Sequence, residues 1–486
     1  MAGRAPTCDP VGTYLSPRRP DVSDSTVIRF DANIMARYAQ TGPRYTSYPT
    51  APQFKDKIAP QDYVRAATAS ADALLGRPLS LYVHIPFCSS PCLYCGCNKI
   101  VTRDLTRMKR YMGCLTQEIA WRGAYFDSAR VVEQLHFGGG TPTYLPKATL
   151  VQLMQHLAQH FQLSDAPDRD YSIEIDPRSV DRDTLALLKE LGFNRVSLGV
   201  QDFDPKVQIA VNRVQPAEMV QDVYDAAREL GFGSINFDLI YGLPLQSIKT
   251  FTETLDRVIA MRPDRLAVYG YAHMPQLFKA QRRIRAEELP DASTRMALLQ
   301  LAVGMLGAAG YLYIGLDHFA LPSDTLAQAK REQTLHRSFQ GYTTHANRDL
   351  VSFGVSAIGR VGGLYLQNYK RLADYESAIE RGVLPTERGI QVDQDDRIRA
   401  DVIQQIMCHG LVDIQALQVS HGIEFEEYFS PELQRLRPLL ADGLVEVTDS
   451  HIRLTPSGQL LMRAVAMAFD GYLHADAEPV AMSQVV

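Results

Sequence analysis

The sequence has 486 residues, of which 46% are hydrophobic and 22% charged, and its formal net charge is −5. This composition is typical of a globular protein with room for one large domain and smaller ones. No run of about 18 apolar residues is present, which excludes a membrane-spanning helix. The slight acidic excess argues against bulk electrostatic binding of nucleic acid.

Residues 1–28 are polar, contain prolines and have no apolar segment of the kind that directs secretion. We therefore expect a flexible leader on a cytoplasmic protein.

Four of the seven cysteines lie within ten residues, namely Cys88, Cys92, Cys95 and Cys97. The first three have the spacing C-x3-C-x2-C, with which one loop could place three thiolates around a single iron–sulfur cluster. A [4Fe–4S] cluster normally has four cysteine ligands, so with three one iron stays open to a substrate or cosubstrate. This pattern favours an enzyme.

Two other uses of these cysteines fit less well. A structural zinc site needs a second ligand pair a dozen or more residues away, and none follows Cys97. A disulfide framework is disfavoured because seven cysteines in 486 residues are few and odd in number. We expect Cys8, Cys114 and Cys408 to be ordinary thiols.

Short apolar runs alternate with longer amphipathic segments between residues 80 and 272. The runs are residues 79–86, 132–137, 171–176, 195–200, 235–241 and 265–271, and helix-like segments include 104–126, 148–161 and 217–230. Alternating strands and helices predict a parallel sheet. Six such units are fewer than the eight of a closed TIM barrel, so we predict an α/β fold with a partial, open (β/α)6 barrel.

Two of the predicted strands carry polar side chains at alternate positions. Ser172, Glu174 and Asp176 alternate with isoleucines, and Asn236 and Asp238 alternate with apolar residues. Alternation places each polar set on one face, which would be the barrel interior. Buried carboxylates are costly unless they are paired or bind something. A network with a neighbouring arginine is one explanation, and a ligand-filled interior is the one we prefer.

Residues that follow the predicted strands are candidates for chemistry, because such folds place their sites at the carboxyl ends of strands. The segment GGGTP at 138–142 exposes backbone groups to a ligand, although three glycines also occur in ordinary tight turns. Gln201 follows another strand, and Arg213 lies in the next loop.

The pattern changes from about Asp393, with helical segments at 397–408, 414–419 and 431–442, a hairpin and a last helix. This order resembles a winged-helix arrangement. The segment IEFEEYFSPELQRLRPLL, nearest to a recognition helix, has four glutamates against two arginines, whereas a helix that reads a DNA groove should be basic. We therefore expect a mostly helical lid over the barrel rather than a DNA-binding domain.

Together, the cysteine loop, the GGGTPT turn and the partial barrel resemble the radical S-adenosylmethionine (SAM) superfamily. Within it, the chain is similar to the oxygen-independent coproporphyrinogen III oxidases of haem biosynthesis. The resemblance covers nearly all of the chain beyond the leader, through blocks such as PRYTSYPTAPQF, YVHIPFC, LHFGGGTPTYL, IEIDPR, GVQDFD, NFDLIYGLP and LHRSFQGYTT.

The resemblance implies one [4Fe–4S] cluster, held by Cys88, Cys92 and Cys95, and two SAM molecules. Cys97 matches a cysteine that marks this group without binding iron, and we assign it a catalytic role. The first SAM would bind the open iron and contact Tyr82, Gly139, Glu174, Ala272 and Ile358. The second would contact Tyr94, Gly140, Thr141, Gln201, Arg213 and Asp238. Glu174 and Asp238 were already singled out by strand alternation.

The implied reaction is anaerobic and begins with one electron passing from the cluster to the first SAM, which yields methionine and a 5′-deoxyadenosyl radical. The radical removes a hydrogen atom from the β-carbon of a porphyrinogen propionate, and loss of CO2 and one more electron leaves a vinyl group. The propionates of rings A and B react in turn, giving protoporphyrinogen IX. The sequence does not name the electron donor, which would be a flavodoxin or ferredoxin system, or the final acceptor.

A substrate with four carboxylates should meet basic groups. Candidates are Arg44 and the set Arg103, Arg107, Lys109 and Arg110, although the latter four could equally form a solvated helix face. We expect four regions: a leader (1–28), an N-terminal segment covering the substrate (29–78), the barrel with its extension (79–385) and the helical lid (386–486). We expect a monomer without nucleic-acid or membrane partners. The main alternative is a related haem chaperone or haem-handling protein.

Overall fold

The computed structural model describes residues 28–73, 77–127, 129–346 and 348–474, so nearly all of the expected leader lies outside the described residues. Within the described ranges, no helix is long and apolar enough to cross a membrane.

Six parallel strands form the centre of the molecule, in the spatial order β9-β8-β7-β6-β4-β1. They are β1 (Leu79–Ile85), β4 (Val131–Gly139), β6 (Asp170–Ile175), β7 (Arg195–Gln201), β8 (Ser234–Tyr241) and β9 (Arg265–Gly270). Each coincides with a predicted run to within one residue or two at its ends. Neighbours in space are neighbours along the chain, so each crossover runs over the outer face of the sheet, as the alternating pattern predicts.

The sheet continues beyond the six predicted strands on both sides. Next to β1 lies a further parallel strand, β14 (Asp349–Phe353), followed by the antiparallel strands β15 (Ile358–Val361), β16 (Leu364–Asn368) and β17 (Thr386–Gln391). Next to β9 lie the antiparallel strands β11 (His318–Ala320) and β10 (Leu312–Gly315). In the part of the chain that the structure describes, β10 and β17 end the sheet without pairing with each other, so the barrel is open.

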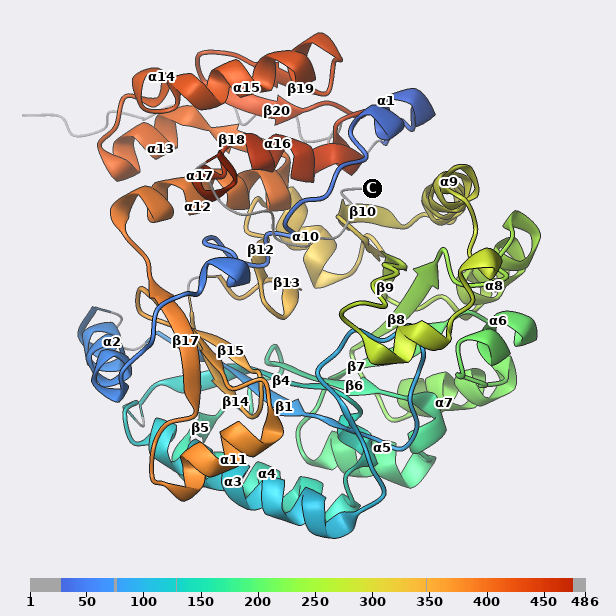
Figure 1. Ribbon diagram of the computed structural model, residues 1–486, viewed down its shortest axis with the longest axis vertical. Helices are drawn as coiled ribbons and strands as arrows, with labels where there is room; N and C mark the ends of the chain where they lie inside the picture. Colours follow the sequence, from blue (N-terminus) through green and yellow to red (C-terminus); the bar gives the residue numbers. More distant parts are fainter. Residues whose placement is uncertain (1–27, 74–76, 128, 347, 475–486) are drawn as a thin grey trace, which may run out of the picture.

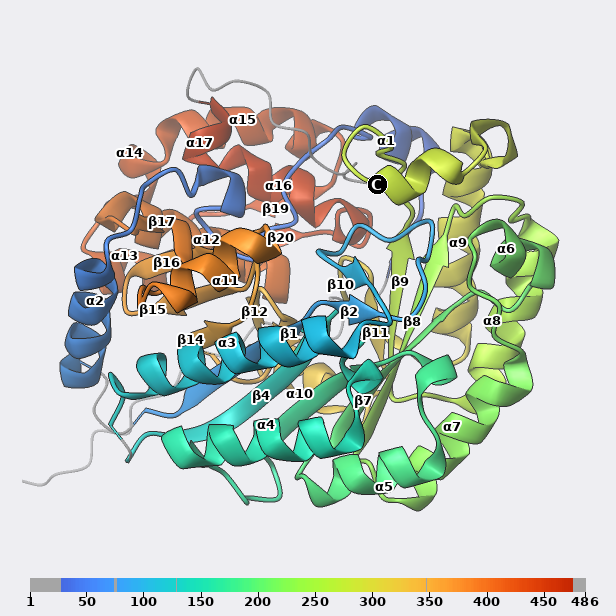
Figure 2. The same ribbon diagram turned by 60° about the horizontal axis from the view of Figure 1, so that its bottom comes forward.

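Helices cover the outer face of this curved sheet (Figures 1 and 2). They are α3 (Leu105–Gly123), α4 (Lys147–His160), α5 (Arg182–Glu190), α7 (Ala217–Glu229), α8 (Ile248–Met261) and α9 (Ala292–Ala308). The α3 helix shows how the sequence sets its start: the Asp104 side chain accepts hydrogen bonds from the backbone N–H groups of Thr106 and Arg107. The apolar sides of these helices pack on the sheet in one continuous core.

The C-terminal region contains α12 (Gln394–His409), α13 (Ile414–His421), α14 (Phe425–Tyr428), α15 (Ser430–Ala441), α16 (Met462–Ala468) and α17 (Gly471–His474). A small antiparallel sheet joins β18 (Leu411–Asp413), β20 (His451–Leu454) and β19 (Val445–Val447). The predicted helices and hairpin are therefore confirmed.

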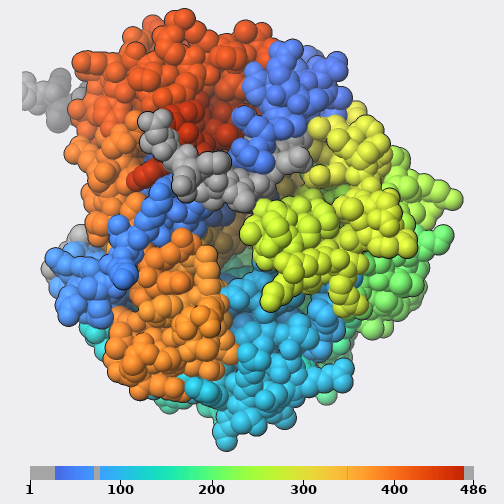
Figure 3. All heavy atoms as spheres, viewed as in Figure 1, coloured from blue at the N-terminus to red at the C-terminus, as the bar shows by residue number. Residues whose placement is uncertain are grey.

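In the N-terminal segment, α1 (Ala32–Arg37) lies beside the C-terminal region (Figure 3), whereas α2 (Pro60–Ala73) packs on β15. Tyr38 donates a hydrogen bond to Asp442 (2.7 Å), and Arg463 Nε donates one to the Pro43 carbonyl (2.9 Å).

A buried ion pair ties α3 to the extension of the sheet. Glu118 and Arg122 are 0% and 1% exposed, and Arg122 Nε lies 2.8 Å from Glu118 Oε1. The second carboxylate oxygen of Glu118 accepts hydrogen bonds from the Tyr375 hydroxyl (2.7 Å) and the Gly354 backbone (2.8 Å). Arg122 also donates to the Asn368 side chain (2.9 Å). Since every partner is buried, neither charge can recover hydration if the other is removed.

We predict that Glu118→Leu lowers the free energy of unfolding by about 3–5 kcal/mol, because it leaves the Arg122 guanidinium buried without its counter-charge. The double variant Glu118→Leu with Arg122→Leu should recover part of that loss. Urea denaturation measures both. As the control, Glu229→Gln breaks the exposed Arg182–Glu229 pair and should cost less than about 1 kcal/mol. Equal effects of Glu118→Leu and Glu229→Gln would contradict this account.

Candidate active site

The cysteine loop leaves the carboxyl end of β1. Two short parallel strands, β2 (Phe87–Cys88) and β3 (Ile100–Val101), close its base. Cys88 and Cys92 are buried, Cys95 is half-buried and Cys97 is exposed. No disulfide forms among them, so all four thiols are free to act as ligands or reactants.

Hydrogen-bond donors and positive charge surround the first two sulfur atoms. The Thr141 hydroxyl lies 3.5 Å from Cys88 Sγ, and guanidinium nitrogens of Arg213 and Arg178 lie 3.4 and 3.7 Å from Cys92 Sγ. Burial raises the pKa of the Cys88 thiol to about 11, an effect that metal coordination would reverse because a coordinating thiol is deprotonated.

Among the described residues, no three His, Cys, Asp or Glu side chains are gathered around one metal ion. Ligands of an iron–sulfur cluster bind separate irons, so they need not converge on one point. A set of thiols from one loop, near donors that stabilise thiolates, fits such a cluster.

The GGG segment lies directly against the base of this loop. The Gly140 and Thr141 N–H groups donate to the carbonyls of Ile85 and Phe87, both at 2.8 Å. A Cβ atom on Gly140 would lie 2.7 Å from the backbone carbon and oxygen of Pro86. Only glycine permits this approach, so the segment is more than an ordinary turn.

Next to it, Tyr82, Gly139 and Glu174 lie close together; that they contact the first SAM stays a prediction. Glu174 Oε2 accepts a hydrogen bond from the Gly139 N–H (3.0 Å), and Oε1 lies 3.4 Å from His136 Nε2. The Tyr82 ring stacks on His136, with centroids 5.8 Å apart. Although burial opposes ionisation, the bonds from His136 and Gly139 hold the pKa of Glu174 below its usual value. The Glu174 side chain is still 44% exposed, so its neighbours leave room for a ligand.

A second group lies across β7 and β8. Asp238 accepts hydrogen bonds from Ser197 (3.0 Å) and Asn236 (2.9 Å), and burial, followed by the nearby charge of Glu174, raises its pKa to about 6. A Cβ atom on Gly199, which pairs with Asp238 in the sheet, would meet side-chain nitrogens of Gln201 and Arg213 at 2.8 and 2.7 Å. The predicted second-SAM residues of these strands therefore meet at one place.

Three of the predicted SAM contacts, Tyr94, Ala272 and Ile358, form no hydrogen bond with Glu174 or Asp238 in the described part of the chain. The carbonyls of Tyr94 and Ala272 both accept hydrogen bonds from Gln281, which places the two residues together at one side of the cysteine loop. Ile358, on β15, packs instead with Phe54 and Tyr365. Its role as a SAM contact stays a prediction.

Sequence reasoning gave no supporting role to several residues that hold the site together. Asp176 pairs with both Arg178 (2.7 Å) and Arg213 (3.1 Å), and these arginines reach Cys92. His136 connects Tyr82 with Glu174. The strand alternation singled out Asp176 as an interior carboxylate, and the block IEIDPR contains Arg178, so a signal for this pair was present.

The predicted basic candidates separate into two groups. Arg103, Arg107, Lys109 and Arg110 are exposed, and Arg110 pairs with Glu380 at 2.7 Å, which favours a solvated helix face for these four. Arg44 instead forms an ion pair with Asp317 and lies 5.7 Å from the centroid of the Tyr269 ring. Arg44 is therefore positioned near strand β9 of the barrel.

Comparisons with known proteins agree with this geometry. Residues 82–258 match the model of the radical SAM superfamily, and residues 392–461 match the HemN C-terminal domain. A solved structure described as coproporphyrinogen III oxidase (HemN) from Escherichia coli, a radical SAM enzyme, is similar over 92% of this chain and 99% of that one. Its TM-score is 0.87, at 45% sequence identity. The fold and the cysteine loop are thus those of a radical SAM enzyme.

Relatives extend the similarity over nearly the whole sequence. An oxygen-independent coproporphyrinogen III oxidase of Pseudomonas aeruginosa is 50% identical over 446 residues, which are 92% of this chain and 96% of the relative. The oxidase of Escherichia coli K12 is 45% identical over 94% of this chain and 99% of its own length. The chain belongs to the family of oxygen-independent coproporphyrinogen III oxidases.

We predict that Gly140→Ala reduces the iron bound after reconstitution by at least about threefold, because the added Cβ pushes the backbone at Pro86 and displaces the cysteine loop. Iron and labile-sulfide analysis of the purified protein measures this. The matched control is Gly304→Ala, on α9, where an added Cβ meets nothing within 4 Å. Full iron content in Gly140→Ala would show that the loop does not depend on this contact.

Proposed function

We propose that this enzyme converts coproporphyrinogen III to protoporphyrinogen IX, turning the ring A and ring B propionates into vinyl groups without oxygen. The observation that carries the proposal is the convergence of the cysteine loop, the Glu174 group and the Asp238 group at the carboxyl ends of adjacent parallel strands. The family to which the chain belongs supports the substrate, since its relatives are named for it.

Cys88, Cys92 and Cys95 would hold the [4Fe–4S] cluster, with the first SAM on the open iron. When bound, cluster and SAM supply a carbon radical that removes a hydrogen atom from the propionate β-carbon, so no general base is needed. The protein positions the reactants. Ionised Glu174, aligned by His136 and Gly139, suits the hydroxyl groups or amine of the first SAM. Arg213, held by Asp176, suits the carboxylate of the second.

The N-terminal segment is proposed to cover the bound substrate together with the C-terminal lid. Tyr45 donates a hydrogen bond to Asp470 (2.9 Å), and the Gly471 N–H donates to the Tyr48 hydroxyl (3.0 Å), so the RYTSYPT block is fixed to the last helices. A covered site excludes water and protects a radical from side reactions. We further propose that the protein works as a cytoplasmic monomer with a flavodoxin or ferredoxin system as its electron donor.

An anaerobic assay tests the proposed function. It would contain the reconstituted protein, coproporphyrinogen III, SAM and a low-potential reductant, with porphyrins and 5′-deoxyadenosine measured together. We expect protoporphyrinogen to appear with 5′-deoxyadenosine. Formation of 5′-deoxyadenosine without decarboxylation would contradict the assigned substrate and favour the haem-handling alternative, which haem-binding titration would then test.

A variant of Cys97 can distinguish cluster binding from turnover. The Cys97 backbone N–H lies 3.4 Å from Cys95 Sγ, and its own side chain is exposed, so we propose a catalytic role without iron ligation. Cys97→Ser should retain the iron of the wild-type protein but lower decarboxylation at least about tenfold. Cys95→Ser is the matched variant and should lose iron. Loss of iron in Cys97→Ser would contradict the assignment.

A further inference from the structure

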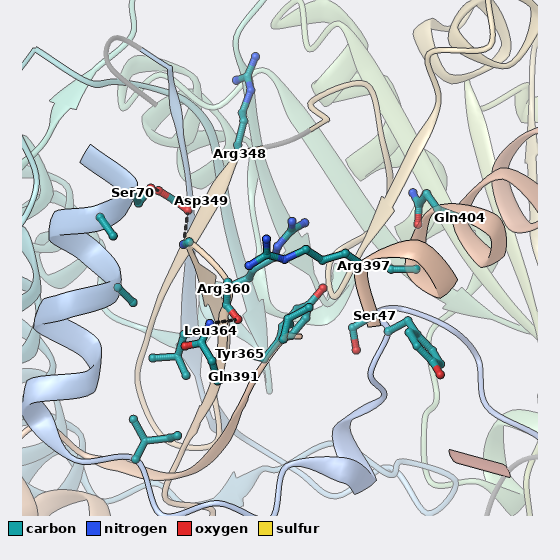
Figure 4. Close-up of a pocket in the computed structure, with 18 of the residues that line it drawn as sticks. Ser47, Ser70, Arg348, Asp349, Arg360, Leu364, Tyr365, Gln391, Arg397 and Gln404 are labelled. Carbon is teal, nitrogen blue, oxygen red and sulfur yellow. Dashed lines mark hydrogen bonds between the residues drawn. The ribbon is translucent and has the colours of Figure 1, made fainter. Parts of the chain in front are cut away.

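A cavity of about 900 Å³ lies away from the cysteine loop, between the N-terminal segment, the β15–β17 extension and α12 (Figure 4). This volume is within the range of about 300–1,000 Å³ that is typical of small-molecule sites. Seven Lys and Arg residues line it, against four Asp. Three of those aspartates have partners, namely Arg65, Arg130 and His421. Two of the seven cations are also paired, Arg65 with Asp62 and Arg348 with Glu133, which leaves five. The cavity therefore has an excess of positive charge.

Several of its arginines have no anionic partner. Arg337 is 5% exposed, and its Nε and Nη1 atoms make no hydrogen bond. Its guanidinium lies 4.7 Å from the centroid of the Tyr342 ring and also interacts with the Tyr342 hydroxyl, which is not an anion. Arg360 and Arg397 form no ion pair within the described ranges of the chain, and Figure 4 shows them extending from opposite walls toward the same part of the cavity, near Tyr365. Arg337 is buried without an anionic partner among the described residues, which is costly, whereas Arg360 is half-buried and Arg397 exposed. The three guanidinium groups are therefore available to an anionic ligand.

The cavity adjoins the barrel interior. Arg337, Arg348 and Arg360 also line a smaller space whose other residues include Ser80 of β1 and Gln134 of β4. Two residues further along the same faces of these strands are Tyr82 and His136, which contact each other beside Glu174. Two residues of a strand span about 7 Å. The arginines thus lie next to strand positions that are about 7 Å from the predicted site of the first SAM.

We propose that Arg337, Arg360 and Arg397 bind the carboxylates of a tetrapyrrole, namely the two propionates that do not react. This inference rests on the proposed function. A tetracarboxylate with two reacting arms toward Glu174 needs cations for the other two arms on the opposite side. Guanidinium groups bind carboxylates with paired hydrogen bonds.

Titration with coproporphyrin III tests this without turnover, because the oxidised macrocycle is fluorescent and keeps all four carboxylates. In the reconstituted protein, Arg360→Gln with Arg397→Gln should weaken binding at least about tenfold, while the lysine pair Arg360→Lys with Arg397→Lys should retain more affinity. The control, Arg182→Gln with Arg257→Gln, removes two charges from the outer helices α5 and α8 and should bind as the wild type does. Unfolding curves would verify that each variant is folded.

Two outcomes would overturn the inference: equal affinity of the glutamine pair and the control, or an unchanged KM for coproporphyrinogen in the glutamine pair. Either could occur while the wild-type protein still makes protoporphyrinogen, in which case the proposed function stands. Conversely, arginine-dependent porphyrin binding in a protein without decarboxylase activity would support the cavity assignment and remove the proposed reaction.

Discussion

The site depends on the close approach of two backbone segments, the GGG turn after β4 and the base of the cysteine loop after β1. Hydrogen bonds from Gly140 and Thr141 to Ile85 and Phe87 hold them together. Because β1 and β4 are adjacent parallel strands, both segments leave the sheet at the same edge. Glu174 reaches Gly139 from the next strand, so its carboxylate lies at the turn that supports the cysteine loop. A side chain at Gly140 would separate the two segments.

A second constraint is the handling of charge inside the barrel. Glu174 and Asp238 lie near each other inside the barrel, and hydrogen bonds lower the pKa of the first while burial raises that of the second to about 6. Ion pairs with Asp176 hold Arg213 and Arg178 near Cys92. The barrel interior therefore holds both acidic and basic side chains in fixed places. This suits a cosubstrate that carries an amine, a carboxylate and a sulfonium.

The sequence predicted the six central strands, the helices between them and the C-terminal helices, since each has a clear period of two or of 3.6 residues. Strand alternation alone found Glu174 and Asp238. The extension was not resolved in advance: the β14 strand is five buried residues long and finds its place only by pairing with β1, far away in sequence. Arg337, Arg360 and Arg397 were missed for a similar reason. They come from separate elements that only the tertiary fold brings together, and no local pattern connects them.

In the proposed reaction, a radical formed at the cysteine loop removes a hydrogen atom from a substrate propionate. The most direct measurement uses coproporphyrinogen III deuterated at the propionate β-carbons, with mass spectrometry of the 5′-deoxyadenosine formed under anaerobic conditions. We expect deuterium in 5′-deoxyadenosine together with vinyl product. Vinyl product with unlabelled 5′-deoxyadenosine would contradict direct hydrogen-atom removal and require a different route to the vinyl group.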